Sequence, residues 1–150
     1  MNNKNHFSGR VLAAAVKVKD TIDQKFDLVT TTPLLQSIKD PLEPKWKNAE
    51  TFAIELKVNR KELQGAFKYY YDKGINEYQA ERKIEAACIL LANGEMTKKE
   101  IAIELDFDQD YFCSVFKKWM GMTPTEWQKK ELERKIPIRK ELSAKIEEDK

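Results

Sequence analysis

The feature that most constrains this chain is an internal repeat. Residues Asn48–Tyr78 and Thr97–Trp127 align without a gap at an offset of 49 positions. The identities shared by the two copies are Ala53–Leu56 with Ala102–Leu105, Phe67-Lys68 with Phe116-Lys117, and Glu77 with Glu126. A repeat of this length indicates a duplicated supersecondary unit.

Each copy predicts two short helices joined by a tight turn. In the second copy, apolar residues recur at helical spacing in two groups, which are Ile101, Ala102 and Leu105, then Phe112, Val115, Phe116 and Trp119. Between the groups, Phe107 lies between two aspartates that are candidate helix caps, Asp106 and Asp108. This pattern is typical of a helix-turn-helix, whose second helix is shaped to enter a DNA major groove.

The second copy also carries a specific set of residues in a specific order. These residues are Ile101-Ala102, Phe107 in the turn, Phe116-Lys117 late in the second helix, then Gly121 and Thr123-Pro124. In this respect the copy resembles the second helix-turn-helix of the AraC/XylS family of bacterial transcription regulators. The first copy resembles the first helix-turn-helix of that family, and residues 81–94 resemble the helix joining the two. The resemblance covers about Asn48 to Trp127.

The chain departs from the family at the turn of the second copy, where Asp106 stands in place of the usual glycine. Aspartate tolerates the left-handed backbone conformation better than most residues. We therefore expect the turn to form.

The resemblance implies an all-α fold, in which two helix-turn-helix subdomains of the homeodomain-like, three-helix type are joined by a long linker helix. The expected parts are a disordered N-terminus (1–8), a first subdomain (9–93) with an insertion (28–47) and the linker helix (77–92), a second subdomain (94–136), and a charged C-terminal helix or tail (137–150). The linker of about 16 residues spans roughly 24 Å. Once the width of the helix-turn-helix units is added, this length suits recognition helices about 34 Å apart.

Before the repeat, the spacing of Val11, Ala15, Val18 and Ile22 predicts an amphipathic helix over Gly9–Phe26. In the insertion, Thr32-Pro33 predicts the start of a short helix with Leu34, Leu35 and Ile38 on one face. We interpret the insertion as a packed surface excursion anchored by Trp46. A contact site for a partner protein is the alternative.

The outward side of the first recognition helix carries Arg60, Lys61, Gln64, Gly65 and Lys68. Glutamine pairs with adenine, lysine pairs with guanine, and the remaining cations suit phosphate. The resemblance implies that Lys61, Gln64 and Gly65 face bases. A solvated basic surface without a ligand is the alternative.

In the second recognition helix the expected base-facing residues are Gln109, Cys113 and Ser114, with Lys117 and Lys118 on the DNA backbone. The first copy has no net charge, whereas the second has a net charge of −2 and three aspartates at the start of its recognition helix. Carboxylates repel phosphates, so we expect the first copy to supply most of the sequence readout.

Three neighbouring aromatics, Tyr69-Tyr70-Tyr71, close the first recognition helix. Interleaved aromatics can stack on single-stranded bases. Because Tyr70 aligns with Trp119, we instead expect both of these residues in the core.

Composition limits the remaining function classes. The 150 residues, 41% of them hydrophobic, can bury one good core or two small ones. There is no apolar run of membrane-spanning length and no export leader, and Cys88 and Cys113 suit a reducing cytoplasm. The only histidine, His6, lies in the polar N-terminal segment, and no metal-ligand spacing or phosphate-binding glycine loop is present, so an enzyme is not expected.

We therefore expect a monomeric, sequence-specific transcription regulator of the AraC type that binds double-stranded DNA, without a cofactor, a metal or a membrane. RNA polymerase is a candidate further partner. The alternative is a protein-interaction module on a helix-turn-helix scaffold that has lost DNA binding, which the acidic second copy favours.

Overall fold

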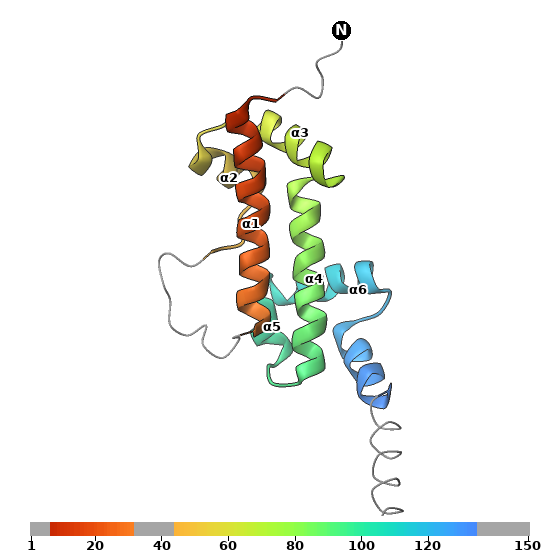
Figure 1. Cartoon of the computed structure of the whole chain (residues 1–150). Helices are drawn as coiled ribbons and strands as arrows, with labels where there is room; N and C mark the ends of the chain where they lie inside the picture. The colour runs from red at the N-terminus through yellow and green to blue at the C-terminus, as the bar shows by residue number, and fades with distance from the viewer. Residues whose placement is uncertain (1–6, 32–43, 135–150) are drawn as a thin grey trace, which may run out of the picture. The chain divides into compact units, whose positions relative to one another are not determined.

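The computed structural model describes residues 7–31 and 44–134, and within these ranges it is helical without strands (Figure 1). The helices are α1 (Gly9–Thr31), α2 (Ala49–Leu56), α3 (Arg60–Tyr71), α4 (Ile75–Asn93), α5 (Lys98–Glu104) and α6 (Gln109–Met120). Residues 124–134 are also helical. The expected all-α fold is confirmed.

The chain divides into two compact units, and the division falls inside α4, after Ala86. Helices α1, α2 and α3 belong to the first unit together with the first part of α4. Helices α5 and α6 belong to the second unit together with the last part of α4. Each unit therefore contains one copy of the repeat preceded by a helix.

In the first unit α1 packs against both α2 and α3. The apolar face predicted for α1 is confirmed, because Val11, Ala15, Val18 and Ile22 are all buried. The helix continues past Phe26 to Thr31 and buries Val29 as well. The first residues of the expected insertion are therefore helical, whereas the short helix expected from Thr32 to Ile38 lies outside the described residues.

The segment before α2 is attached to α4 by its backbone and by one aromatic ring. The Lys47 N–H donates to Gln79 Oε1 (3.1 Å), and Gln79 Nε2 donates back to the Lys47 carbonyl (2.9 Å). Trp46 is only 8% exposed, and the Lys83 ammonium lies over its ring. Trp46 is thus the buried anchor that the sequence predicted.

The two copies of the repeat share their cap geometry. The matching residues, each pair at the same 49-residue offset, are the N-caps Asn48 and Thr97, the left-handed turn residues Lys57 and Asp106, the N-caps Asn59 and Asp108, and the left-handed C-caps Asp72 and Gly121. Because caps fix where each helix begins and ends, α3 and α6 occupy equivalent positions in the two copies.

The turn between the two helices is closed by the same backbone hydrogen bond in each copy. Val58 N–H donates to the Ala53 carbonyl (3.1 Å), and Phe107 N–H donates to the Ala102 carbonyl (2.8 Å). Asp106 adopts a left-handed conformation with φ of 57°, as expected for a residue that replaces glycine here. The turn therefore forms despite the departure from the family pattern.

The core positions expected for Tyr70 and Trp119 are wrong. Tyr70 is 53% exposed and Trp119 is 41% exposed. The place beside Phe67 is taken instead by Tyr71, whose ring meets it edge-on at 4.8 Å, and by Tyr78 of α4 at 5.7 Å. Helical spacing correctly placed Leu63 and Phe67 on the buried side of α3. Tyr70, near the end of the helix, lies beyond the part of that side that is covered.

The strained turn residue of the first copy provides a test of the shared geometry. Lys57 has φ of 57°, a conformation that is unfavourable for a residue with a Cβ atom. Replacing it with glycine, Lys57→Gly, should raise the free energy of unfolding by up to about 1 kcal/mol, measured by urea denaturation. The control Ile54→Gly, inside the preceding helix, should lower it by a similar amount. A loss of stability in Lys57→Gly would contradict the assignment.

Candidate nucleic-acid interface

Helix α3 is oriented by three side chains with no solvent exposure, Leu63, Ala66 and Phe67. Its remaining surface carries the exposed cations Arg60, Lys61 and Lys68. None of these cations forms an ion pair with a carboxylate of the described residues. Their charge is therefore available to a ligand such as a phosphate backbone.

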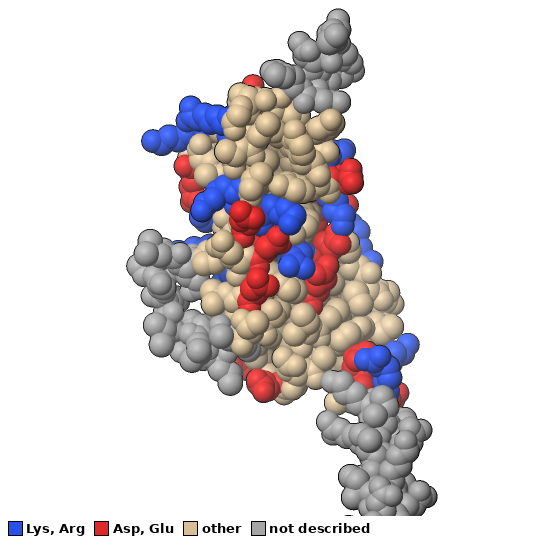
Figure 2. Space-filling view, viewed as in Figure 1, with Lys and Arg blue, Asp and Glu red and all other residues tan. Residues whose placement is uncertain are grey.

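Charge elsewhere on the first unit is mixed. On the face shown in Figure 2, acidic side chains lie along α1 and α4 with basic groups among them. This face does not attract a polyanion as a whole. The exposed cations of the recognition helix supply a local attraction instead.

Gln64 lies on α3 with its amide oxygen already bonded. Its Oε1 accepts from the backbone N–H of Ile75 (3.3 Å), the first residue of α4. Bidentate pairing with adenine needs the amide oxygen and the amide NH₂ together. The Ile75 N–H uses one of the two lone pairs of this oxygen, so Gln64 keeps one acceptor position and both donors of its NH₂ group.

Gly65, also expected to face bases, is covered in part by an aromatic ring from the start of the chain. A Cβ atom at Gly65 would lie 3.5 Å from Cε1 of Phe7. The Phe7 ring also lies 6.2 Å from that of Tyr69, measured between centroids. Sequence reasoning missed Phe7, although an apolar residue directly before the Ser8 cap of α1 was a usable signal.

Helix α6 is oriented in the same way as α3, by the fully buried Phe112 and Phe116. The residues expected to contact bases or backbone are exposed, except for the half-buried Cys113, and they are Gln109, Ser114, Lys117 and Lys118. The Ser114 hydroxyl donates to the Asp110 carbonyl within the helix (3.3 Å). The Ser114 oxygen keeps its capacity to accept a hydrogen bond.

The three aspartates at the start of α6 have local explanations. Asp106 is the left-handed turn residue, and Asp108 is the N-cap, whose carboxylate accepts from the Asp110 N–H at 3.1 Å. Asp110 lies in the first turn, where a negative charge favours the helix dipole. These acids stabilise α6, and they also place negative charge at its N-terminal end.

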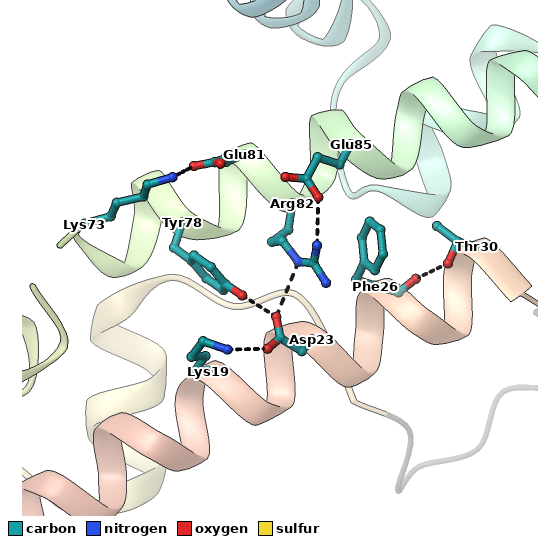
Figure 3. A network of polar contacts seen from close by, with 9 residues as sticks. All are labelled: Lys19, Asp23, Phe26, Thr30, Lys73, Tyr78, Glu81, Arg82 and Glu85. Carbon is teal, nitrogen blue, oxygen red and sulfur yellow. Dashed lines mark hydrogen bonds and ion pairs between the residues drawn. The ribbon is translucent and has the colours of Figure 1, made fainter. Parts of the chain in front are cut away.

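A polar network connects α1 to α4 (Figure 3). Asp23 accepts hydrogen bonds from Tyr78 Oη and from Lys19 Nζ (2.8 Å), and Arg82 Nε lies 3.3 Å from its Oδ1. The Arg82 guanidinium also lies over the Phe26 ring at 3.7 Å and donates to Glu85. Arg82 thus pairs with carboxylates.

The network shifts the pKa values of its members. Burial alone would raise the pKa of the Asp23 carboxyl, but hydrogen bonds from Lys19 and Tyr78 outweigh it, and the pKa is lowered. Burial, together with the hydrogen bond to Asp23, raises the pKa of Tyr78 to about 12. Because the Tyr78 ring also contacts Phe67, the network helps to hold α3 in its orientation.

The described part of the chain contains no cluster of three or more histidine, cysteine, aspartate or glutamate side chains that could hold a metal ion. None of its helices combines the length and the apolar character needed to cross a membrane.

Comparison with known proteins identifies the same region. A family model described as a helix-turn-helix domain matches residues 52–130, a little over half of the chain. The F1 operon positive regulatory protein of Yersinia pestis is 32% identical over 101 residues, which cover 67% of this chain and 34% of that protein. The transcriptional activator RhaR of Escherichia coli K12 is 29% identical over 98 residues, covering 65% of this chain and 33% of that protein. The chain thus matches about a third of the length of these relatives.

Two solved structures share the fold. The C-terminal domain of the response regulator yesN from Fusobacterium nucleatum matches with a TM-score of 0.59 and 20% identity, covering 77% of this chain and 98% of that one. A DNA-binding transcriptional dual regulator from Escherichia coli K-12 matches with a TM-score of 0.52 and 19% identity, covering 75% and 93%.

The network between α1 and α4 provides a test by pH. The folded pKa of Tyr78, about 12, exceeds the unfolded value of about 10. Its contribution to stability is therefore complete below pH 10 and is lost as the pH rises through 12. Tyr78→Phe should lower the free energy of unfolding by about 1.5 kcal/mol at pH 8, and this difference from the wild type should shrink towards pH 12.

Denaturation curves of the wild type and of Tyr78→Phe across this range measure the effect. Tyr70→Phe is the matched control, because Tyr70 is exposed and should leave both stability and pH dependence unchanged. A difference between Tyr78→Phe and the wild type that stays constant from pH 8 to pH 12 would contradict the assigned hydrogen bond.

Proposed function

Because this chain belongs to the AraC-type helix-turn-helix family of DNA-binding transcription regulators, we propose that it binds double-stranded DNA sequence-specifically, with α3 and α6 entering two segments of major groove. One observation carries the proposal. In both copies the second helix has its caps at matching positions. A buried phenylalanine, also at a matching position, orients the helix; it is Phe67 in α3 and Phe116 in α6. Duplication of a complete recognition unit is the arrangement that reads two neighbouring segments.

On α3 we propose different roles for the exposed cations. Lys61, in the first turn, contacts a base edge, for which guanine offers two acceptors. Arg60 and Lys68, at the two ends of the helix, contact phosphates. Gln64 adds the donors of its NH₂ group, and Gly65 faces the bases without a side chain of its own, beside the Phe7 ring.

On α6 we propose that Gln109, Cys113 and Ser114 face the bases and that Lys117 and Lys118 hold the backbone. Two of these side chains, Cys113 and Ser114, are short or weakly polar, and Asp106, Asp108 and Asp110 lie beside the base-facing residues. We therefore propose that α3 supplies most of the sequence readout and that α6 contributes mainly to positioning.

The partners follow from this role. We propose that the chain acts in the cytoplasm, by binding rather than by catalysis, and without a cofactor. Two recognition helices in one chain support action as a monomer. RNA polymerase is the further partner that we propose, supported by relatives described as a positive regulatory protein and a transcriptional activator.

Selection from random duplex DNA, followed by binding measurements over a range of salt concentrations, tests the proposal. Lys68→Ala should weaken binding to all duplexes alike and reduce the salt dependence by about one phosphate contact. Lys61→Ala should cost about 1–3 kcal/mol on the selected site and relax the preference at one base pair.

Lys17→Ala, which removes the same charge from the exposed surface of α1, is the matched control and should change neither quantity. The proposal fails if a folded wild-type chain retains no duplex at low salt. The assigned roles fail if Lys61→Ala and Lys68→Ala behave alike.

A further inference from the structure

The ring of Phe7 packs on the recognition helix of the first unit. Its Cε1 and Cζ atoms lie 3.5 Å and 3.6 Å from the place of a Cβ atom at Gly65. Ser8 then caps α1, because its Oγ accepts from the Val11 N–H (3.2 Å) and its carbonyl accepts from the Leu12 N–H (3.0 Å). Phe7 is therefore tied to the first turn of α1, which lies beside α3 (Figure 1).

The contact falls within the surface assigned to DNA. Lys61, Gly65 and Lys68 follow one another at i, i+4 and i+7, so they lie along one line of α3. The residues facing the core, Leu63 and Phe67, lie on the other side of the helix. Gly65 has no side chain, and the Phe7 ring lies at ordinary contact distance from the place of a Cβ atom there, so a longer side chain at this position would meet the ring.

The ring is neither isolated nor fully covered. Phe7 is half-buried, so part of its surface stays accessible. Tyr69, which is 49% exposed, lies near both Phe7 and Tyr70, with centroid distances of 6.2 Å and 5.0 Å. Phe7, Tyr69 and Tyr70 therefore form an aromatic cluster beside the line of Lys61, Gly65 and Lys68 on α3.

An apolar ring on a recognition helix has a definite counterpart in the major groove. Base edges there present hydrogen-bond donors and acceptors, and the one apolar substituent is the C5-methyl group of thymine. Phenylalanine is among the side chains that make this contact. The ring cannot hydrogen-bond, so it would discriminate only through this methyl group and through shape.

We propose that Phe7 is a specificity-determining residue that contacts a thymine methyl group in the DNA segment read by α3. This inference rests on the proposed DNA binding. The contact reaches the groove from outside the helix-turn-helix, at the point where the recognition helix itself has only glycine.

Thymine-to-uracil exchange isolates the methyl group. Each thymine of the selected duplex is replaced in turn by deoxyuridine, and binding of the wild type and of Phe7→Ala is compared. One exchange should weaken wild-type binding about fourfold, the factor that corresponds to about 0.8 kcal/mol for one buried methyl group. Phe7→Ala should bind the unmodified duplex correspondingly less well and show no penalty for that exchange.

Two substitutions at Gly65 keep the test independent of the folding of Phe7→Ala. Gly65→Ala places a Cβ atom at ordinary contact distance from the ring, so it should keep the uracil penalty. Gly65→Gln introduces a good helix former whose polar side chain takes the place of the ring, so the penalty should disappear. Tyr111→Ala removes an exposed aromatic from α6 and should keep the penalty.

The outcomes separate the possible explanations. The inference is overturned if no thymine shows a penalty in the wild type, or if Phe7→Ala shows the same penalty. It is equally overturned if Phe7→Ala binds the duplex more tightly, because the ring would then be covering the helix, or loses affinity for all sequences alike. Failure of the wild type to retain any duplex would instead contradict the proposed function.

Discussion

The orientation of each recognition helix depends on one buried phenylalanine, Phe67 in α3 and Phe116 in α6. In both copies its ring contacts an aromatic of the helix that follows, Tyr78 at 5.7 Å and Trp127 at 6.2 Å between centroids. Truncating such a side chain typically costs about 3–5 kcal/mol, so the helix has no comparable alternative orientation. The buried phenylalanine therefore determines which residues of the helix point outward and can contact DNA.

The two copies have the same backbone arrangement, but the exposed surfaces of their recognition helices differ. The caps and turn of α3 and α6 match at every position, yet α3 is bordered by cations and by an aromatic cluster, whereas α6 begins among aspartates. The first unit also has a second support, because Tyr78 donates to Asp23 of α1 while its ring contacts Phe67. Both copies keep the buried phenylalanine and the positions of the caps, whereas most residues on the outward side of the two recognition helices differ.

The sequence predicted the parts of the fold that depend on local chemistry. The repeat, the buried face of α1 and the turn at Asp106 and Asp108 all follow from helical spacing and from backbone preferences over a few residues. The contacts that the sequence did not predict join distant segments. Gln64 bonds the start of α4, and Phe7 packs over Gly65, and neither contact leaves a periodic signal. Spacing also could not show that Tyr70 lies uncovered beside the end of α3.

The central claim is that one chain reads DNA through two equivalently held helices. Methylation interference at guanine N7 tests it most directly, because N7 lies in the major groove. On a selected duplex, the account predicts two segments where methylation prevents binding, about one helical turn apart. Interference confined to one segment, with protection elsewhere limited to phosphates or the minor groove, would contradict it.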